Sequence, residues 1–65
     1  MFVIVNGETR PLPEPPTLTA LLISLSPKTP FAVAYNEEFV SRGDYDSCRI
    51  SSGDRIDIVH PTAGG

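Results

Sequence analysis

The chain has 65 residues, of which 40% are hydrophobic and 20% are charged, and its formal net charge is -3. This length allows one domain, and a core built from fewer than ~70–80 residues rarely supplies more than about 3–5 kcal/mol. An enzyme cleft of about 300–1,000 Å³ would leave little room for that core, so we do not expect an independent enzyme. Eight acidic against five basic residues argue against a nucleic-acid surface, which requires clustered Lys and Arg.

The lengths of the apolar runs and the single cysteine exclude further classes of protein and site. The longest apolar runs, Phe2–Val5 and Ala20–Ile23, fall far short of the ~20 residues that a membrane-spanning helix needs. The N-terminus has no basic region of the kind that begins a signal peptide. A single Cys48 cannot form an internal disulfide, and with the single His60 it cannot supply the four ligands of a structural zinc site. We therefore expect a cytoplasmic monomer that binds no metal and no membrane.

The first predicted element is a hairpin. Residues 2–5 are β-branched or aromatic, which favours a strand. Asn6-Gly7 follows and predicts a type I′ turn, because both central positions of that turn need positive φ. Residues 8–12 should return as a second strand, and Pro11 and Pro13 require that strand to lie at an edge.

A proline-rich stretch follows the hairpin. Residues 10–16 contain four of the seven prolines, and Pro13 and Pro16 have the spacing of a polyproline ligand. We favour a stiff link between two elements, because the stretch lies between two strongly patterned segments.

One amphipathic helix is predicted next. Thr17 suits an N-cap, and Pro27 disfavours helical geometry at Ser26 and so ends the helix. Apolar residues recur at helical spacing and predict a stripe that packs on the core: Leu18, Leu21, Leu22 and Leu25.

The second half of the chain reads as short strands. We predict strands over 31–35, 39–42 and 55–59, a turn over 36–38, and an irregular polar segment over 43–52 anchored by Tyr45 and Ile50. The resulting class is α+β: a roll in which one helix covers one face of a mixed sheet of four to five strands. The domain should span 1–61, and 62–65 should form a flexible tail that ends in two glycines.

No familiar catalytic set is present. One histidine cannot complete a nucleophile–His–acid set, and no glycine-rich phosphate loop occurs. The acidic pairs Glu37-Glu38 and Asp44/Asp46 are interpreted as solvated turns, and Cys48 as a small loop residue rather than a redox or sulfur site. The sequence leaves the roles of His60 and Arg42 open; Arg42 is interpreted either as half of an ion pair or as a contact for a partner.

The C-terminal Gly64-Gly65 is the feature with chemical content. Glycine lacks a Cβ, so such a tail can enter a narrow cleft of another protein. The terminal carboxylate is anionic at neutral pH and can attack the α-phosphate of ATP, which gives an acyl-adenylate open to a sulfur nucleophile. The alternative interpretation is a frayed tail.

Several short motifs together resemble one family. They are Ala32-Val33-Ala34-Tyr35-Asn36, then Val40 and Arg42, then Gly53-Asp54-Arg55-Ile56-Asp57-Ile58, and finally Ala63-Gly64-Gly65. The whole chain, including the early Val5-Asn6-Gly7 turn, resembles the ThiS sulfur carriers of thiamine biosynthesis, which have the ubiquitin-like β-grasp fold of the ThiS/MoaD superfamily. The proline-rich entry to the helix departs from that pattern. The presence of a proline close to the tail, Pro61, resembles the small subunit of molybdopterin synthase.

The resemblance implies a protein co-substrate and not an enzyme. A ThiF-like adenylating enzyme would activate the Gly65 carboxylate with its own ATP and magnesium, while this chain binds no cofactor. A cysteine desulfurase would supply persulfide sulfur for a thiocarboxylate at Gly65. A ThiG-like thiazole synthase would then take the sulfur for the thiazole of thiamine.

Three other functions are compatible with the same residues. The chain could carry sulfur for molybdopterin, cysteine or a tungsten cofactor. It could instead be a ubiquitin-like modifier joined to lysines, or a β-grasp interaction module whose tail has no role.

Strand alternation also predicts a docking face. Val3, Val5, Phe31, Val33, Ile56 and Ile58 should face the helix. Their neighbours should form an apolar patch on the outer face of the sheet, next to the tail, and such a patch commonly marks a binding site. We expect the partners to contact Phe2, Ile4, Ala32, Ala34 and Val59, together with Ala63 of the tail.

Overall fold

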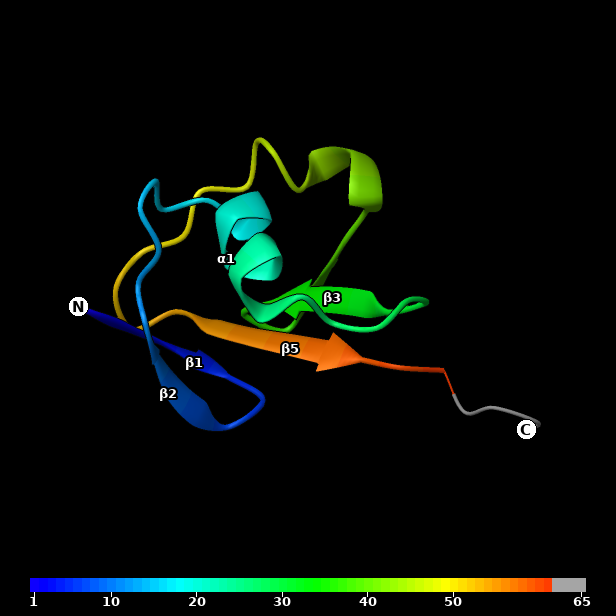
Figure 1. The fold of residues 1–65 in the computed structure, drawn as a ribbon, viewed down its shortest axis with the longest axis horizontal. Coiled ribbons are helices and arrows are strands. Elements are labelled where there is room, and N and C mark those ends of the chain that lie inside the picture. Colours follow the sequence, from blue (N-terminus) through cyan, green and yellow to red (C-terminus); the bar gives the residue numbers. More distant parts are fainter. Residues whose placement is uncertain (62–65) are drawn as a thin grey trace.

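A computed structural model describes residues 1–61 and shows one sheet with one helix packed on it (Figure 1). The elements in chain order are β1 (Phe2–Val5), β2 (Glu8–Pro11), α1 (Leu18–Leu25), β3 (Ala32–Tyr35), β4 (Glu38–Val40), the 3₁₀ helix η1 (Arg42–Asp44) and β5 (Arg55–Val59). The strand order is β2-β1-β5-β3-β4. The predicted α+β class, with a mixed five-stranded sheet and one helix, is confirmed.

The N-terminal hairpin follows from its turn residues. Asn6 and Gly7 have φ of 50° and 83°, the positive values that a two-residue type I′ turn requires. The turn sets the antiparallel register, in which Val5 lies opposite Glu8. β2 is an edge strand, as its prolines predicted.

The helix begins and ends where the sequence places its signals. The Thr17 hydroxyl accepts a hydrogen bond from the Ala20 amide at 3.1 Å, which satisfies one of the free N–H groups of the first turn. Ser26 takes the left-handed conformation just before Pro27 and closes the helix with a bond to the Leu22 carbonyl at 2.7 Å. The predicted stripe packs inward: Leu18, Leu21 and Leu22 are buried, and Leu25 is half-buried against the core.

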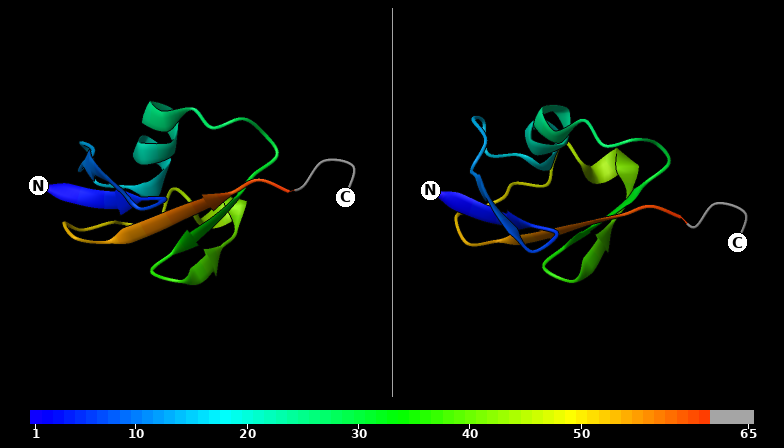
Figure 2. Two further views of the ribbon diagram at one scale, coloured as in Figure 1. Left: turned by 90° about the horizontal axis from the view of Figure 1, so that it is seen from below. Right: turned by 60° about the horizontal axis from the view of Figure 1, so that its bottom comes forward.

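The centre of the sheet joins the two ends of the chain. β1 and β5 run parallel, with Ile4 opposite Arg55 and Val5 opposite Ile56. α1 lies over one face of this sheet and leaves the other face bare (Figure 2). The core between helix and sheet consists of Val3, Val5, Leu18, Leu21, Leu22, Val33, Ile50, Ile56 and Ile58.

Some predicted boundaries were wrong. The strand predicted over 39–42 is β4, and Arg42 belongs instead to η1, because the amides of Asp44 and Tyr45 bond to carbonyls three residues back. The segments predicted over 31–35 and 8–12 each lose one residue, at Phe31 and at Leu12. The link predicted over 10–16 begins after Pro11, because Arg10 and Pro11 belong to β2, and the Pro16 carbonyl accepts from the Ile50 amide at 3.0 Å and so ties the link to the core.

Candidate functional site

The bare face of the sheet carries apolar side chains on four strands. Partners across a ladder share a face, so the pairs Ala32–Val59 and Ala34–Phe39 lie on the same side, opposite the buried Val33 and Ile58. Phe2 and Val59 are 58% and 57% exposed, and Phe39 is 72% exposed. We call these residues the outer patch: Phe2, Ile4, Ala32, Ala34, Phe39 and Val59.

The sheet faces were predicted correctly, whereas Phe39 was missed. Phe39 alternates with Val40, which packs against the core, and this alternation is the signal that could have found it. The outer patch is also less uniform than predicted. The Arg55 guanidinium lies 3.5 Å from the half-buried Asp57 carboxylate on β5, so an ion pair separates the β1 side of the patch from the β3 side.

Two asparagines hold β5, one near each end of the strand. The Asn6 side chain accepts from the Ile58 amide at 2.7 Å and donates to the Ile58 carbonyl at 3.2 Å, so it extends the pairing of β1 beyond the strand's end. At the other end of β5, the Asn36 side chain accepts from the Arg55 amide at 2.9 Å. Because both asparagines also occupy left-handed turn positions, each one serves a hairpin and the central strand at once.

A hydrogen-bonded carboxylate lies at the start of β5. Asp54 accepts hydrogen bonds from the Tyr35 hydroxyl, from the Ser51 amide at 2.7 Å and from the Asn36 amide group at 3.4 Å. Partial burial disfavours the charge, but these donors outweigh it and hold the pKa of Asp54 below its usual value. The hydrogen bond to Asp54, followed by desolvation, raises the pKa of Tyr35 to about 12. These hydrogen bonds hold the turn that precedes β5 in place.

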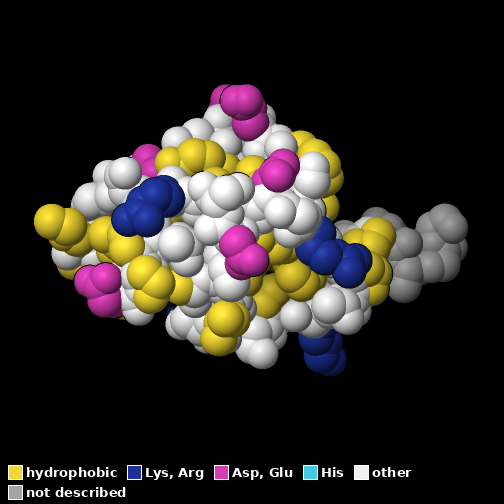
Figure 3. Space-filling view, turned by 90° about the horizontal axis from the view of Figure 1, so that it is seen from above, with side chains coloured by type: hydrophobic (Ala, Val, Ile, Leu, Met, Phe, Trp, Pro, Cys, Tyr) yellow, Lys and Arg dark blue, Asp and Glu magenta, His cyan; other side chains and the backbone are white. Residues whose placement is uncertain are grey.

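A groove opens on the helix side, between α1, the Pro27–Phe31 loop and η1, with a volume of about 630 Å³. Seen from the side of α1, hydrophobic side chains gather in this region, with Lys or Arg atoms beside them (Figure 3). This volume falls within the range of enzyme clefts, although the chain length predicted that a cleft of that size would leave little room for a core. Both are present because the groove lies at the surface of the domain. Its lining residues include no carboxylate, histidine or thiol, so it has no catalytic set.

The structure also gives the surroundings of the other polar candidates. Cys48 is half-buried, and desolvation, followed by the charges of Asp54 and Asp44, raises the pKa of its thiol, which keeps it a poor nucleophile. His60 is exposed, and its ring lies edge-on to Phe31 at 6.5 Å. Glu37, Glu38, Asp44 and Asp46 are all exposed.

Residues 1–61 offer neither a cluster of metal ligands nor a membrane-spanning helix. Within this range, no three His, Cys, Asp or Glu side chains come together as metal ligands. In the same part of the chain, no helix has the length and apolar character needed to cross a bilayer. The predicted site residues Ala63, Gly64 and Gly65 lie outside the described residues.

The strand order, the single helix and the parallel pairing of the first and last strands define a ubiquitin-like β-grasp protein. A similar solved structure is the thiamine biosynthesis protein (ThiS) from Geobacter metallireducens, with a TM-score of 0.83, 25% identity and 100% of both chains covered. The sequence profile of the ThiS family matches residues 3–65, and the chain belongs to this family. The resemblance to the ThiS-like sulfur carriers is confirmed. A comparison with curated proteins gives no match.

Proposed function

We propose that this chain carries sulfur as a thiocarboxylate on Gly65 and donates it to the thiazole of thiamine. The observation that carries the proposal is the family match over residues 3–65, which includes both terminal glycines. The fold supports it, because β5 is held at both ends by side-chain bonds and leads directly to the tail. The similar structure from Geobacter metallireducens is named as a thiamine biosynthesis protein.

The chemistry requires a partner enzyme. A Gly65 carboxylate oxygen attacks the α-phosphorus of ATP and pyrophosphate leaves, which activates the carbonyl as an acyl-adenylate. The terminal sulfur of a persulfide then attacks that carbonyl and AMP leaves. A thiol reduces the resulting sulfur–sulfur bond and releases the thiocarboxylate. Gly64 lets the chain approach the reacting centre closely, since no Cβ stands beside it.

The partners belong to the same proposal. An adenylating enzyme of the ThiF type activates Gly65 with its own ATP and magnesium, a cysteine desulfurase supplies the persulfide, and a thiazole synthase of the ThiG type receives the sulfur. They dock on the outer patch, with Ala63 contributing from the tail. The carrier is a co-substrate that is consumed and reloaded in each cycle, and it works as a monomer in the cytoplasm.

Intact mass tests this function directly. After co-expression with the adenylating enzyme and the desulfurase, the wild-type chain should gain the mass of one sulfur less one oxygen. Deletion of Gly65, or a tag that follows it, should abolish that gain, while the circular dichroism spectrum is retained. Normal sulfur loading of the tagged chain would contradict the proposal, and isopeptide-linked bands on a denaturing gel would indicate a modifier instead.

A further inference from the structure

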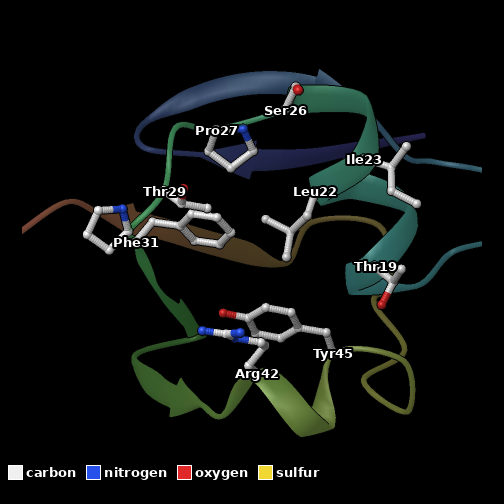
Figure 4. A pocket seen from close by; sticks show the side chains of 10 residues that line it. Thr19, Leu22, Ile23, Ser26, Pro27, Thr29, Phe31, Arg42 and Tyr45 are labelled. Carbon is white, nitrogen blue, oxygen red and sulfur yellow. The ribbon is translucent and has the colours of Figure 1, made fainter.

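The groove beside α1 has walls from three separate segments. α1 supplies Thr19, Leu22 and Ile23, the following loop supplies Phe31, and η1 with the next residue supplies Arg42 and Tyr45 (Figure 4). The Thr19 hydroxyl bonds to the Asp46 carboxylate at 2.5 Å and joins two of these segments. A hydrogen bond within the domain therefore holds two walls of the groove together.

Most of the groove wall is apolar and accessible. The Phe31 and Tyr45 rings are nearly parallel, at 9°, with their centroids 6.5 Å apart, and both rings are half-buried against the core. Ile23 is 74% exposed, although it lies on the helix beside the buried Leu22. An exposed isoleucine next to two fixed aromatic rings offers a site for one further apolar side chain.

Arg42 gives the groove a positive charge. The ion pairs made within residues 1–61 join Arg10 to Glu8 and Arg55 to Asp57, so Arg42 has no carboxylate partner in this part of the chain. Its guanidinium lies beside the Tyr45 ring, at the side of the groove that faces Phe31 (Figure 4). A planar guanidinium in this position suits a carboxylate, which it can bind through two parallel hydrogen bonds.

The groove lies near the proposed reactive end. Phe31 contacts the His60 ring, and Gly65 is four residues beyond Pro61. Four extended residues reach at most about 13–14 Å. An enzyme that holds the Gly65 carboxylate in its active site must therefore lie close to the end of the domain where the groove opens.

We propose that this groove is a second docking site for the adenylating enzyme. It receives a segment of that enzyme in which an apolar side chain stands beside an Asp or Glu. The apolar side chain packs between Ile23 and the two rings, and the carboxylate pairs with Arg42. The outer patch lies on the opposite face of the sheet, so the enzyme contacts the domain on both sides of β5. This inference rests on the proposed function.

Steady-state adenylation by the enzyme of the same organism tests the site. Arg42→Glu and Ile23→Asp should each raise the KM for the carrier about tenfold, because each places a repelled or desolvated charge in the contact, and leave kcat within about twofold. Arg10→Glu is the matched control: it reverses a charge on β2, away from the groove, and should leave the KM unchanged. Circular dichroism checks that all three variants fold.

The outcomes separate the two proposals. A wild-type chain that gains no sulfur contradicts the proposed function. A wild-type chain that is loaded, together with an Arg42→Glu variant of unchanged KM, overturns the groove alone. A rise in KM as large for Arg10→Glu as for Arg42→Glu also overturns it, since the effect is then one of net charge.

Photo-crosslinking provides a second readout that depends on position. With p-benzoylphenylalanine in place of Ile23, the carrier should crosslink to an enzyme peptide that contains an acidic residue next to an apolar one. The same group in place of Glu8, on the edge strand, should give little product. No crosslink from position 23, or one to a peptide without an acidic residue, would overturn the proposal.

Discussion

The hydroxyl of Tyr35 and the carboxylate of Asp54 form a pair whose two pKa values are displaced in opposite directions. The folded pKa of Asp54 is lowered, so its contribution to stability is present above about pH 4 and is lost as the pH falls through the folded pKa. The folded pKa of Tyr35 is raised from 10.0 to about 12, so its contribution is intact below pH 10.0 and is lost as the pH rises toward 12.

Tyr35→Phe tests this pair. The variant should lose about 1.5–3 kcal/mol of unfolding free energy at neutral pH, the value of one hydrogen bond to a charged group. Urea unfolding as a function of pH should show that this loss shrinks below about pH 4 and above about pH 10, where the wild type loses the same interaction. A difference that stays constant over the whole range would mean that the bond does not stabilise the fold. Tyr45→Phe is the control, because Tyr45 makes no bond to Asp54.

At the scale of elements, short sequence motifs predicted the features that depend on residues close together in the chain. The Asn6-Gly7 turn, the Thr17 cap and the leucine stripe act through neighbours in sequence, and all three were predicted. η1 was not predicted, because the i→i+3 bonds at Arg42 leave no strong pattern in the sequence, and Phe39 was missed although it alternates with Val40. The groove could not be predicted either. Its walls are joined by contacts such as Thr19–Asp46, which are 27 residues apart.

The end of α1 carries a second prediction. Ser26 has φ of 51° and ψ of 54°, a left-handed conformation that costs an L residue more than glycine. Ser26→Gly should therefore raise the unfolding free energy by about 0.5–1 kcal/mol, and the melting temperature by several degrees in a chain of this size. Ser24→Gly, two residues earlier on the exposed face of the helix, should lower the unfolding free energy by about 0.5 kcal/mol. Equal effects of the two changes would show that the cap conformation has no part in the gain.

At the scale of the molecule, the central strand has two functional sides. Its buried side holds the helix through Ile56 and Ile58, and its outer side carries Arg55, Asp57 and Val59. The tail follows directly from this strand. Any partner that takes the tail therefore approaches a strand, β5, that is paired with a neighbouring strand on each edge.

The last prediction concerns the outer patch. Ala34 lies in its middle, between Phe39 and Asp57. Ala34→Asp and Ala34→Lys should both weaken docking of the adenylating enzyme and of thiazole synthase about tenfold or more, because either one places a larger, charged side chain in a contact that loses its water on docking. The lysine variant should be more stable than the aspartate variant. Position 34 lies opposite Asp57 across the ladder, so a lysine there attracts the Asp57 carboxylate, whereas an aspartate there repels it.

Pull-down and sulfur transfer measure docking, and a thermal melt measures the fold. Ser52→Lys is the control for added charge, since Ser52 is exposed in the turn before β5, at the opposite end of that strand from the tail. The lysine variant decides the question, because its fold is preserved by the pairing with Asp57. If it docks and transfers sulfur like the wild type, the outer patch is ordinary surface, and the partners must recognise the tail and the helix side alone.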